Sequence, residues 1–287
     1  MNKRPAALAA TALALALTLT ACSGSGEDAE STGSAASGTT VSHIHGLGLD
    51  PASRRLYVAT HEGVYTPGAQ GKPEPVGDSR DDFMGFTVAG ARTFYASGHP
   101  TSGGNKGLIK STDAGKSWKT LSLAGESDFH ALDFAHGTVY GYDSTNGLVR
   151  TTRNGVSWRD GARLEAIDIA VSPQDTGLVL ATTADGVARS ADGGRTFARA
   201  EKPVMAYLSW AARDALYGMD PSGGVHRSGD GGRTWKKAAT VPGGRPQALT
   251  AVDAEHILAA TRTGVYESKD GGHAFTKRLA VASNGTH

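Results

Sequence analysis

Residues 228–235 read SGDGGRTW, and the rest of the chain is organised around copies of this stretch. Residues 111–118 (STDAGKSW), 190–197 (SADGGRTF) and 268–275 (SKDGGHAF) have the same form. Residues 151–158 (TTRNGVSW) are a degenerate copy, in which Arg153 stands where the others have aspartate. The third position therefore falls at residues 113, 153, 192, 230 and 270, which are 38 to 40 residues apart. Such spacing predicts a repeat architecture.

The residue types in these copies predict a hairpin turn. The aspartate can accept hydrogen bonds from backbone amides of the turn, and the glycine supplies a positive φ. The aromatic residue enters the next strand and anchors its core, a role expected for Trp118, Trp158, Phe197, Trp235 and Phe275. The pattern resembles the Asp-box, or BNR repeat, of sialidases, sortilin-type ectodomains and related β-propellers, and the chain is similar to bacterial glycosyl hydrolase-like lipoproteins. The resemblance implies a propeller but leaves the activity open, because one fold hosts many activities.

The repeat unit consists of four expected strands, of which the third begins with Gly-Val or Gly-Leu. These dipeptides start at residues 63, 107, 147, 186, 224 and 264, which gives six units. Four strands per roughly 40–45 residues is the spacing of propeller blades. We therefore expect an all-β propeller of six four-stranded blades, with the Asp-box turns between third and fourth strands. A seventh, irregular blade is the alternative, and Thr39–Ser42 is the candidate strand for closing the ring against the last blade.

The amino terminus has the features of a targeting signal. Lys3 and Arg4 precede an apolar stretch over residues 6–19 that is short for a membrane span. Residues 19–22 (LTAC) resemble a bacterial lipobox, which implies cleavage before Cys22, the only cysteine, and its acylation; an ordinary secretory signal is the alternative. We expect a signal peptide over 1–21, a lipid-anchored flexible linker over 22–40, the propeller over 41–281 and a tail over 282–287. The mature protein would then lie outside the cytoplasm, anchored to the bacterial cell membrane.

Composition excludes some classes of function. The 287 residues carry a net charge of +1, which gives no electrostatic basis for binding nucleic acid. The chain contains no nucleotide-binding glycine loop and no zinc-type cysteine pairs. The 39 glycines fit an architecture of many short strands and turns.

Candidate site residues come from aligning the first strand of each unit. In each unit one residue precedes the glycine or alanine that leads into the apolar run, and these residues are His45, Met84, His130, Glu165, Met205 and Gln247. Innermost strands line the central channel of a propeller, so equivalent positions form a ring around its axis. The small residue that follows is what close approach of the inner strands requires. Asp133 and Asp168 fall three residues after the aligned positions of their units, His130 and Glu165. We expect both aspartates to point away from the channel and bind neighbouring backbone.

Strand direction brings further histidines to the same end of the blades. The loops after the second strands carry His61, His99 and Asp143, and His43 lies two residues before His45. Imidazole together with thioether suits copper, especially Cu(I), and zinc gains little from methionine. We therefore predict a binding protein with a metal site at the channel mouth, copper being favoured over zinc. Its ligands would come from His43, His45, His99, His130, Met84, Met205 and Glu165, with His61 further out.

Two other classes of function remain open. The sialidase resemblance implies an exo-glycosidase, but the ring holds no arginine for a substrate carboxylate, and no sialidase residue is carried over. Glycosidases generally need two opposed carboxylates; here Glu165 would act with Asp128 or Asp143, while Asp81, Asp82 and Glu62 approach the rim. The third class is an interaction or assembly module that binds a protein at the channel face, with Tyr142, Tyr207 and Trp210 as candidate contacts. Metal ion, glycan and protein ligand thus remain the alternative partners.

Overall fold

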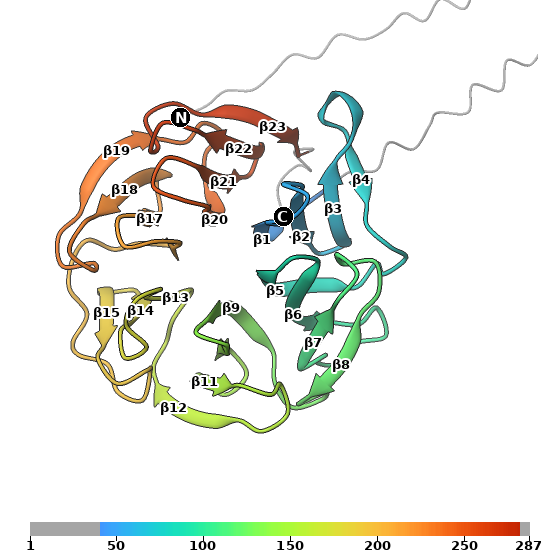
Figure 1. The fold of residues 1–287 in the computed structure, drawn as a ribbon, viewed down its shortest axis with the longest axis horizontal. Coiled ribbons are helices and arrows are strands. Elements are labelled where there is room, and N and C mark those ends of the chain that lie inside the picture. The colour runs from blue at the N-terminus through green and yellow to red at the C-terminus, as the bar shows by residue number, and fades with distance from the viewer. Residues whose placement is uncertain (1–40, 282–287) are drawn as a thin grey trace, which may run out of the picture. The chain divides into compact units, whose positions relative to one another are not determined.

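The computed structural model describes residues 41–281, which form a six-bladed β-propeller around a central opening (Figure 1). The expected signal peptide, Cys22, the linker up to residue 40 and the tail over 282–287 lie outside the described residues. Within residues 41–281, no helix is long and apolar enough to cross a membrane. The prediction of six blades is confirmed.

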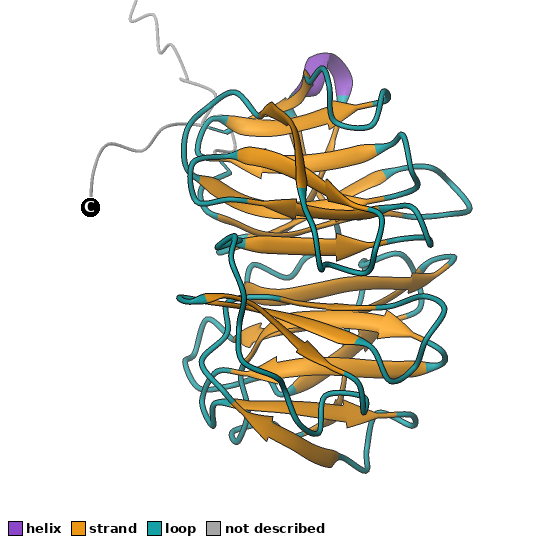
Figure 2. Cartoon of the chain, turned by 90° about the vertical axis from the view of Figure 1, so that its left-hand side faces the viewer, coloured by secondary structure: helices purple, strands orange, loops and turns teal. Residues whose placement is uncertain are grey.

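Each blade is an antiparallel sheet whose strands follow one another in chain order. Figure 2 shows the blades from the side. Blade one contains β1 (Ile44–Leu49), β2 (Leu56–Thr60), β3 (Gly63–Pro67) and β4 (Pro73–Pro75); blade two contains β5 (Asp82–Gly90), β6 (Thr93–His99), β7 (Leu108–Ser111) and β8 (Lys119–Ser122). Blade three contains β9 (Phe129–Ala135), β10 (Thr138–Asp143), β11 (Leu148–Thr152) and β12 (Arg159–Arg163). Blade four contains β13 (Ile169–Val171), β14 (Val179–Thr183) and β15 (Gly186–Ser190). Blade five contains β16 (Tyr207–Trp210), β17 (Leu216–Met219), β18 (Gly224–Ser228) and β19 (Lys236–Thr240); blade six contains β20 (Pro246–Ala251), β21 (Ile257–Thr261), β22 (Gly264–Ser268) and β23 (Thr276–Ala280).

Blade four departs from the four-stranded pattern. Its sheet has three strands, and the place of an outer strand is taken by the segment around Glu201, which forms an isolated bridge with Val187. The two residues exchange backbone hydrogen bonds of 2.8 and 3.0 Å. Blade one differs at another point, because a short 3₁₀ helix (Ala69–Gly71) stands between β3 and β4, where the other blades carry the repeated turn.

The repeated turn lies between the third and fourth strands, as expected. In blade five, Asp230 Oδ1 accepts backbone N–H bonds from Arg233 and Thr234 at 3.0 and 2.9 Å, and Asp230 Oδ2 accepts the Thr234 hydroxyl at 2.6 Å. The Ser228 hydroxyl donates to Asp230 at 2.9 Å and accepts the Gly232 amide at 2.8 Å. Side-chain oxygens thus satisfy backbone donors that no strand partner reaches.

The degenerate copy in blade three has a different register from the one predicted. Asn154, not Arg153, occupies the acceptor position, and its Oδ1 accepts the amides of Val156 and Ser157 at 2.9 and 2.8 Å. Thr152 takes the part of the serine and accepts the Gly155 amide at 2.9 Å. The segment from the hydroxyl residue to the aromatic residue is one residue shorter in this turn than in the other copies. Aligning the copies on the aromatic residue therefore misplaces the polar residues of this turn by one position.

The inner strands approach one another closely enough to require small residues. A Cβ atom on Gly46 would lie 2.8 Å from Phe86 Cβ, and one on Gly85 would lie 2.2 Å from the Phe129 carbonyl oxygen. Both distances are shorter than van der Waals contact. The glycines that follow the aligned first-strand positions are therefore required by the packing of blade on blade.

The ring closes by side-chain packing within the described residues. No strand is shared between blades six and one, and Val41 and Ser42 lie in no strand, so no pairing of the segment before β1 with blade six is seen from residue 41 on. Instead Val41, Ile44 and Leu47 pack against Leu258 and Leu279 in one buried cluster. The Ile44 amide donates to Gln247 Oε1 at 3.3 Å and the Thr250 hydroxyl to the Leu47 carbonyl at 2.8 Å.

Candidate functional site

Five histidines lie at one end of blades one to three. His43 directly precedes β1, His45 is the second residue of β1, and His61 is in the turn between β2 and β3. His99 ends β6, and His130 is the second residue of β9. The sheets are antiparallel and run outward in chain order, so first strands begin where second strands end. The side chains form two groups, the first being His43, His45 and His61 and the second His99, Asp128 and His130.

The first group, called here the three-histidine group, contains closely packed imidazole rings. His45 Nε2 and His61 Nε2 are 3.3 Å apart. The His43 ring is 4.7 Å from the His45 ring and 5.3 Å from the His61 ring, measured between centroids. One nitrogen from each of the three residues lies within 4.8 Å of the other two. Such an array of nitrogen donors is suited to a transition-metal ion.

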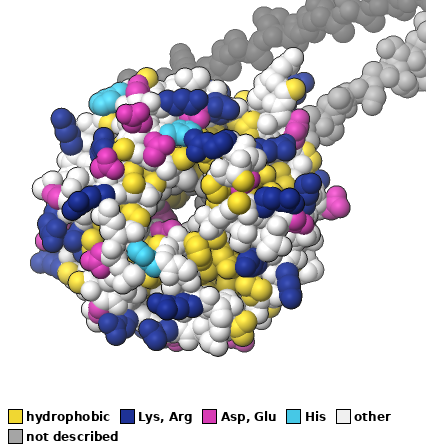
Figure 3. All heavy atoms as spheres, viewed as in Figure 1, with side chains coloured by type: hydrophobic (Ala, Val, Ile, Leu, Met, Phe, Trp, Pro, Cys, Tyr) yellow, Lys and Arg dark blue, Asp and Glu magenta, His cyan; other side chains and the backbone are white. Residues whose placement is uncertain are grey.

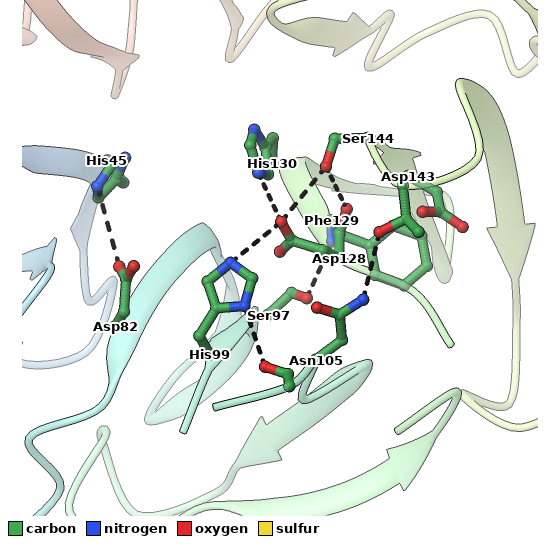
Figure 4. A network of polar contacts seen from close by, with 12 residues as sticks. His45, Asp82, Ser97, His99, Asn105, Asp128, Phe129, His130, Asp143 and Ser144 are labelled. Atoms are coloured by element: carbon green, nitrogen blue, oxygen red, sulfur yellow. Dashed lines mark hydrogen bonds and ion pairs between the residues drawn. The ribbon is translucent and has the colours of Figure 1, made fainter. Parts of the chain in front are cut away.

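Asp82, the first residue of β5, orients this group from the neighbouring blade. Its Oδ2 lies 3.0 Å from His61 Nδ1, so an N–H on Nδ1 is held by the carboxylate. The lone pair of His61 is then on Nε2, the atom that faces His45. Carboxylates that fix the tautomer of a histidine in this way commonly stand behind metal ligands. Asp82 Oδ1 lies 4.0 Å from His45 Nε2, as Figure 4 shows.

The second group, called here the His99–Asp128–His130 group, is centred on a buried carboxylate. Asp128 Oδ2 lies 2.6 Å from His130 Nε2 and 3.3 Å from His99 Nε2 (Figure 4). The Ser144 hydroxyl is 3.3 Å from the same oxygen. His99 Nδ1 lies 3.0 Å from the Gly104 carbonyl oxygen, so Nδ1 carries the proton and Nε2 presents its lone pair to the group.

Three carboxylate oxygens around these groups are buried without a hydrogen-bond partner among the described residues. They are Glu62 Oε2, Asp82 Oδ1 and Asp128 Oδ1. A buried carboxylate oxygen without a partner loses hydration and gains nothing in return, a cost that a bound cation or a buried water molecule would offset.

Burial keeps the central histidine neutral. The pKa of His45 is lowered to about 3, first because burial disfavours the imidazolium and second because His61 and His43 lie beside it. The pKa of His43 is also lowered, again mainly by burial. A neutral imidazole has a free lone pair, which is the form that coordinates metal.

Met205 and Glu165 are not brought into either group. Met205 precedes β16, is fully buried and packs in the core between blades four and five with Leu180 and Trp235. Glu165 is exposed and lies four residues before β13 begins. The prediction that these two residues stand on innermost strands is wrong, because the innermost strands of blades four and five begin later than the alignment placed them. Met84 is half-buried on β5, and Gln247 is engaged in closing the ring.

The carboxylates considered for glycosidase chemistry have other partners. Asp143 is fully buried and accepts bonds from Asn146 and Arg150 at 2.9 and 3.2 Å.

The two aspartates expected to bind neighbouring backbone do so. Asp133 accepts the Val171 amide and Asp168 accepts the Leu208 amide, both at 2.8 Å and both from the next blade. Both residues, like their neighbours along the chain, contribute to the wall of the central cavity. Burial raises the pKa of Asp168 to about 7.

The site opens onto a central cavity of about 570 Å³, whose walls are the innermost strands. The space-filling view shows a hollow at the centre of one face of the molecule (Figure 3). His45 and His130, one from each group, both line this cavity. Tyr207 and Trp210 line it as well, whereas Tyr142 is buried in the core between blades three and four.

The sequence contained a signal for the two aspartates that organise the groups. Asp82 and Asp128 each lie two residues before an aligned first-strand position, just as His43 lies two residues before His45. The sequence patterns predict Asp82 at the rim and Asp128 as a carboxylate partner of Glu165, and neither beside the histidines. The assignment depends on which neighbouring loop each carboxylate faces, and spacing along one strand does not contain that information.

Comparison with known proteins identifies the fold. No family model matches the chain, and no curated protein matches it. A solved structure of a putative gluconolactonase is similar over 84% of this chain and 91% of that one, with a TM-score of 0.62 and 13% identity. Virginiamycin B lyase from Staphylococcus aureus matches over 85% of this chain and 88% of its own, with a TM-score of 0.58 and 11% identity.

An ancestral GH74 enzyme matches over 84% of this chain with a TM-score of 0.56 and 14% identity. The present chain spans only 38% of that enzyme's length. Identities this low establish a shared architecture, and the activities in these names differ from one another, so the comparisons support the fold alone. The chain is a six-bladed β-propeller with a histidine-rich group that could hold a metal ion.

Proposed function

We propose that this protein binds a divalent transition-metal ion, with copper as the favoured ion, through His43, His45 and His61 at the end of the central cavity. The observation that carries the proposal is the 3.3 Å separation of His45 Nε2 and His61 Nε2. Two nitrogens that are each about 2.0–2.1 Å from a tetrahedral ion lie about 3.3 Å apart. The ligand atoms are therefore already spaced for coordination.

The donor set supports Cu²⁺ in preference to Cu⁺. The three-histidine group offers imidazole nitrogens and is backed by a carboxylate, whereas Met205, one of the soft ligands expected for Cu⁺, is buried in the core. Imidazole serves Cu²⁺ and Zn²⁺ alike, and the general order of stability places Cu²⁺ above Zn²⁺. We also propose that Cys22 carries an acyl anchor, so that the site works outside the cytoplasm beside the membrane.

Metal binding is tested on the purified protein with Cu²⁺ and Zn²⁺ in separate equilibrium dialyses, each followed by elemental analysis. We expect the three-histidine group to retain Cu²⁺ with nitrogen hyperfine structure in its electron paramagnetic resonance spectrum. His45→Ala should weaken binding about 100-fold or more, because losing a ligand costs at least as much as losing its supporting carboxylate. His273→Ala is the matched control, since His273 is exposed in the turn between β22 and β23. Undiminished binding by a His45→Ala/His61→Ala variant would overturn the proposal.

A further inference from the structure

We propose that the same end of the propeller holds a second metal ion, bound by His99, Asp128 and His130. The inference rests on the proposed function in one respect, namely that this end of the protein is a metal-binding surface. The second group is nevertheless a separate set of ligands on other strands. His99 comes from β6 in blade two, whereas Asp128 and His130 come from the start of blade three.

The first argument is the convergence of donor atoms. One ring nitrogen of His99, one ring nitrogen of His130 and one oxygen of Asp128 lie within 4.8 Å of one another. The separation of 3.3 Å between His99 Nε2 and Asp128 Oδ2 already equals that of two ligands on one tetrahedral ion. The Gly104 carbonyl holds His99 Nδ1 at 3.0 Å, which leaves Nε2 free to coordinate. Two imidazoles and a carboxylate are a common ligand set of zinc and related divalent ions.

The second argument is the unpaired oxygen of Asp128. This carboxylate is 5% exposed, and its Oδ1 is buried with no hydrogen-bond partner among residues 41–281. Its Oδ2 lies within hydrogen-bond distance of His130 Nε2, at 2.6 Å, and of the Ser144 hydroxyl, at 3.3 Å. Only Oδ2 of the carboxylate therefore has hydrogen-bond partners. Oδ1 keeps a negative potential that a bound cation would neutralise.

The two groups are not equivalent, which predicts two affinities. His130 Nε2 and Asp128 Oδ2 are 2.6 Å apart, a hydrogen-bond distance. An ion between these atoms requires them to separate by about 0.5–0.7 Å, because ligand atoms on one ion lie about 3.1–3.3 Å apart. The three-histidine group needs no such movement at His45 and His61. The His99–Asp128–His130 group should therefore bind its ion more weakly.

Both groups serve the same cavity. His45 and His130 line it, and Asp82 stands between the groups, since its carboxylate contacts His61 while its backbone pairs with His99 across β5 and β6. Figure 4 shows His45 and Asp82 on one side of His99, with Asp128 and His130 on the other.

The test is the metal stoichiometry of the purified protein and of two sets of variants, measured by isothermal titration with Cu²⁺ and by elemental analysis after desalting. We expect two equivalents in the unaltered protein, in two affinity classes. His99→Gln/His130→Ala should leave one equivalent, the tighter one, and His45→Ala/His61→Ala should leave the weaker one. His99→Gln alone keeps the contact between the buried Asp128 and His130 and so guards against misfolding, and circular dichroism of each variant checks the fold. With both sites filled by Cu²⁺, dipolar broadening of the electron paramagnetic resonance signal should disappear in either double variant.

The outcomes separate this inference from the proposed function. A single equivalent that is lost in His45→Ala/His61→Ala and kept in His99→Gln/His130→Ala refutes the second ion and leaves the proposed function standing. A single equivalent lost only in His99→Gln/His130→Ala refutes both the two-ion proposal and the assignment of the first site. No bound metal in the unaltered protein refutes both proposals.

Discussion

At the scale of single residues, the aspartate of the repeated turn ties stability to pH. The pKa of Asp230 is lowered to about 2 from its ordinary value of 3.8, first by the Thr234 hydroxyl and then by the Thr234 amide. A carboxyl whose pKa is lower in the folded state stabilises the fold above its unfolded pKa. That contribution is lost as the pH falls from about 4 to about 2.

We therefore expect Asp230→Asn to lower the free energy of unfolding at pH 7 and to flatten its decline between pH 4 and pH 2.5. An amide accepts at only one of its two heavy atoms, so asparagine can accept the two backbone amides, as Asn154 does in blade three, but cannot also accept the Thr234 hydroxyl. The measurement is urea denaturation at pH 7, 4 and 2.5. Asp214→Asn is the control, because Asp214 is largely exposed and its ion pair with Arg227 is long, at 3.8 Å. Equal acid sensitivity in the two variants would show that the turn does not cause it.

The inner-strand glycines offer a second test at this scale. A Cβ atom on Gly48 would lie 2.3 Å from Val88 Cγ2, whereas one on Gly90 would meet nothing within 4 Å. Gly48→Ala should destabilise the protein by about 1–3 kcal/mol, the usual cost of overpacking, and Gly90→Ala should change stability by less than about 0.5 kcal/mol. The measurement is urea denaturation of the two variants. Equal losses of unfolding free energy in Gly48→Ala and Gly90→Ala would mean that blades one and two can move apart freely.

At the scale of elements, the aromatic residue after each turn fixes one blade against the next. Trp235 packs with Met205 and Leu180, and its Nε1 donates to the Gly232 carbonyl at 3.2 Å. Trp235→Ala should cost about 3 kcal/mol, the lower end for a large aromatic truncation, because the ring is only part-buried. The neighbouring exposed Arg233→Ala provides the control. A loss below about 1 kcal/mol in urea denaturation would show that Trp235 is not an anchor of the blade.

Strands could be predicted from the sequence where the repeated residue pattern is present, and could not be predicted where that pattern is absent. The Gly-Val dipeptides and the turn aromatics located the third and fourth strands, because both features are required by the same turn. Blade four lacks a fourth strand beyond the bridge at Glu201, although its turn at residues 190–197 is regular. The turn chemistry fixes only the turn itself, and the pairing that follows depends on which side chains the outer edge offers.

At the scale of the whole molecule, the five histidines could be placed at one end because strand direction alternates strictly in a propeller blade. The ring of six aligned residues was less predictable. Met205 belongs to an apolar run and packs in the core between blades four and five. Pairing of His61 with Asp82, and of His99 with Asp128, crosses from one blade to the next. Such contacts depend on the twist and packing of whole blades, which a single repeat does not encode.

Closure of the ring leads to a prediction about the whole molecule. A continuous chain connects every other pair of neighbouring blades, but within residues 41–281 blades six and one meet through side chains and a few hydrogen bonds, with Leu279 at 1% exposure in their shared core. Partial opening should therefore begin at this seam, since local unfolding follows the least connected contacts. We expect Leu279→Ala to cost about 2–5 kcal/mol and to accelerate amide hydrogen exchange selectively in β1–β3 and β21–β23.

Leu108→Ala is the matched control, because Leu108 is equally buried between blades two and three, which the chain connects. It should cost a similar free energy without singling out the strands at the seam, since blades two and three cannot separate without moving the segment that joins them. Hydrogen exchange followed by mass spectrometry distinguishes the two variants. Acceleration spread evenly over all six blades in Leu279→Ala would mean that the propeller unfolds as one cooperative unit, and that side-chain packing closes the ring as firmly as a shared strand would.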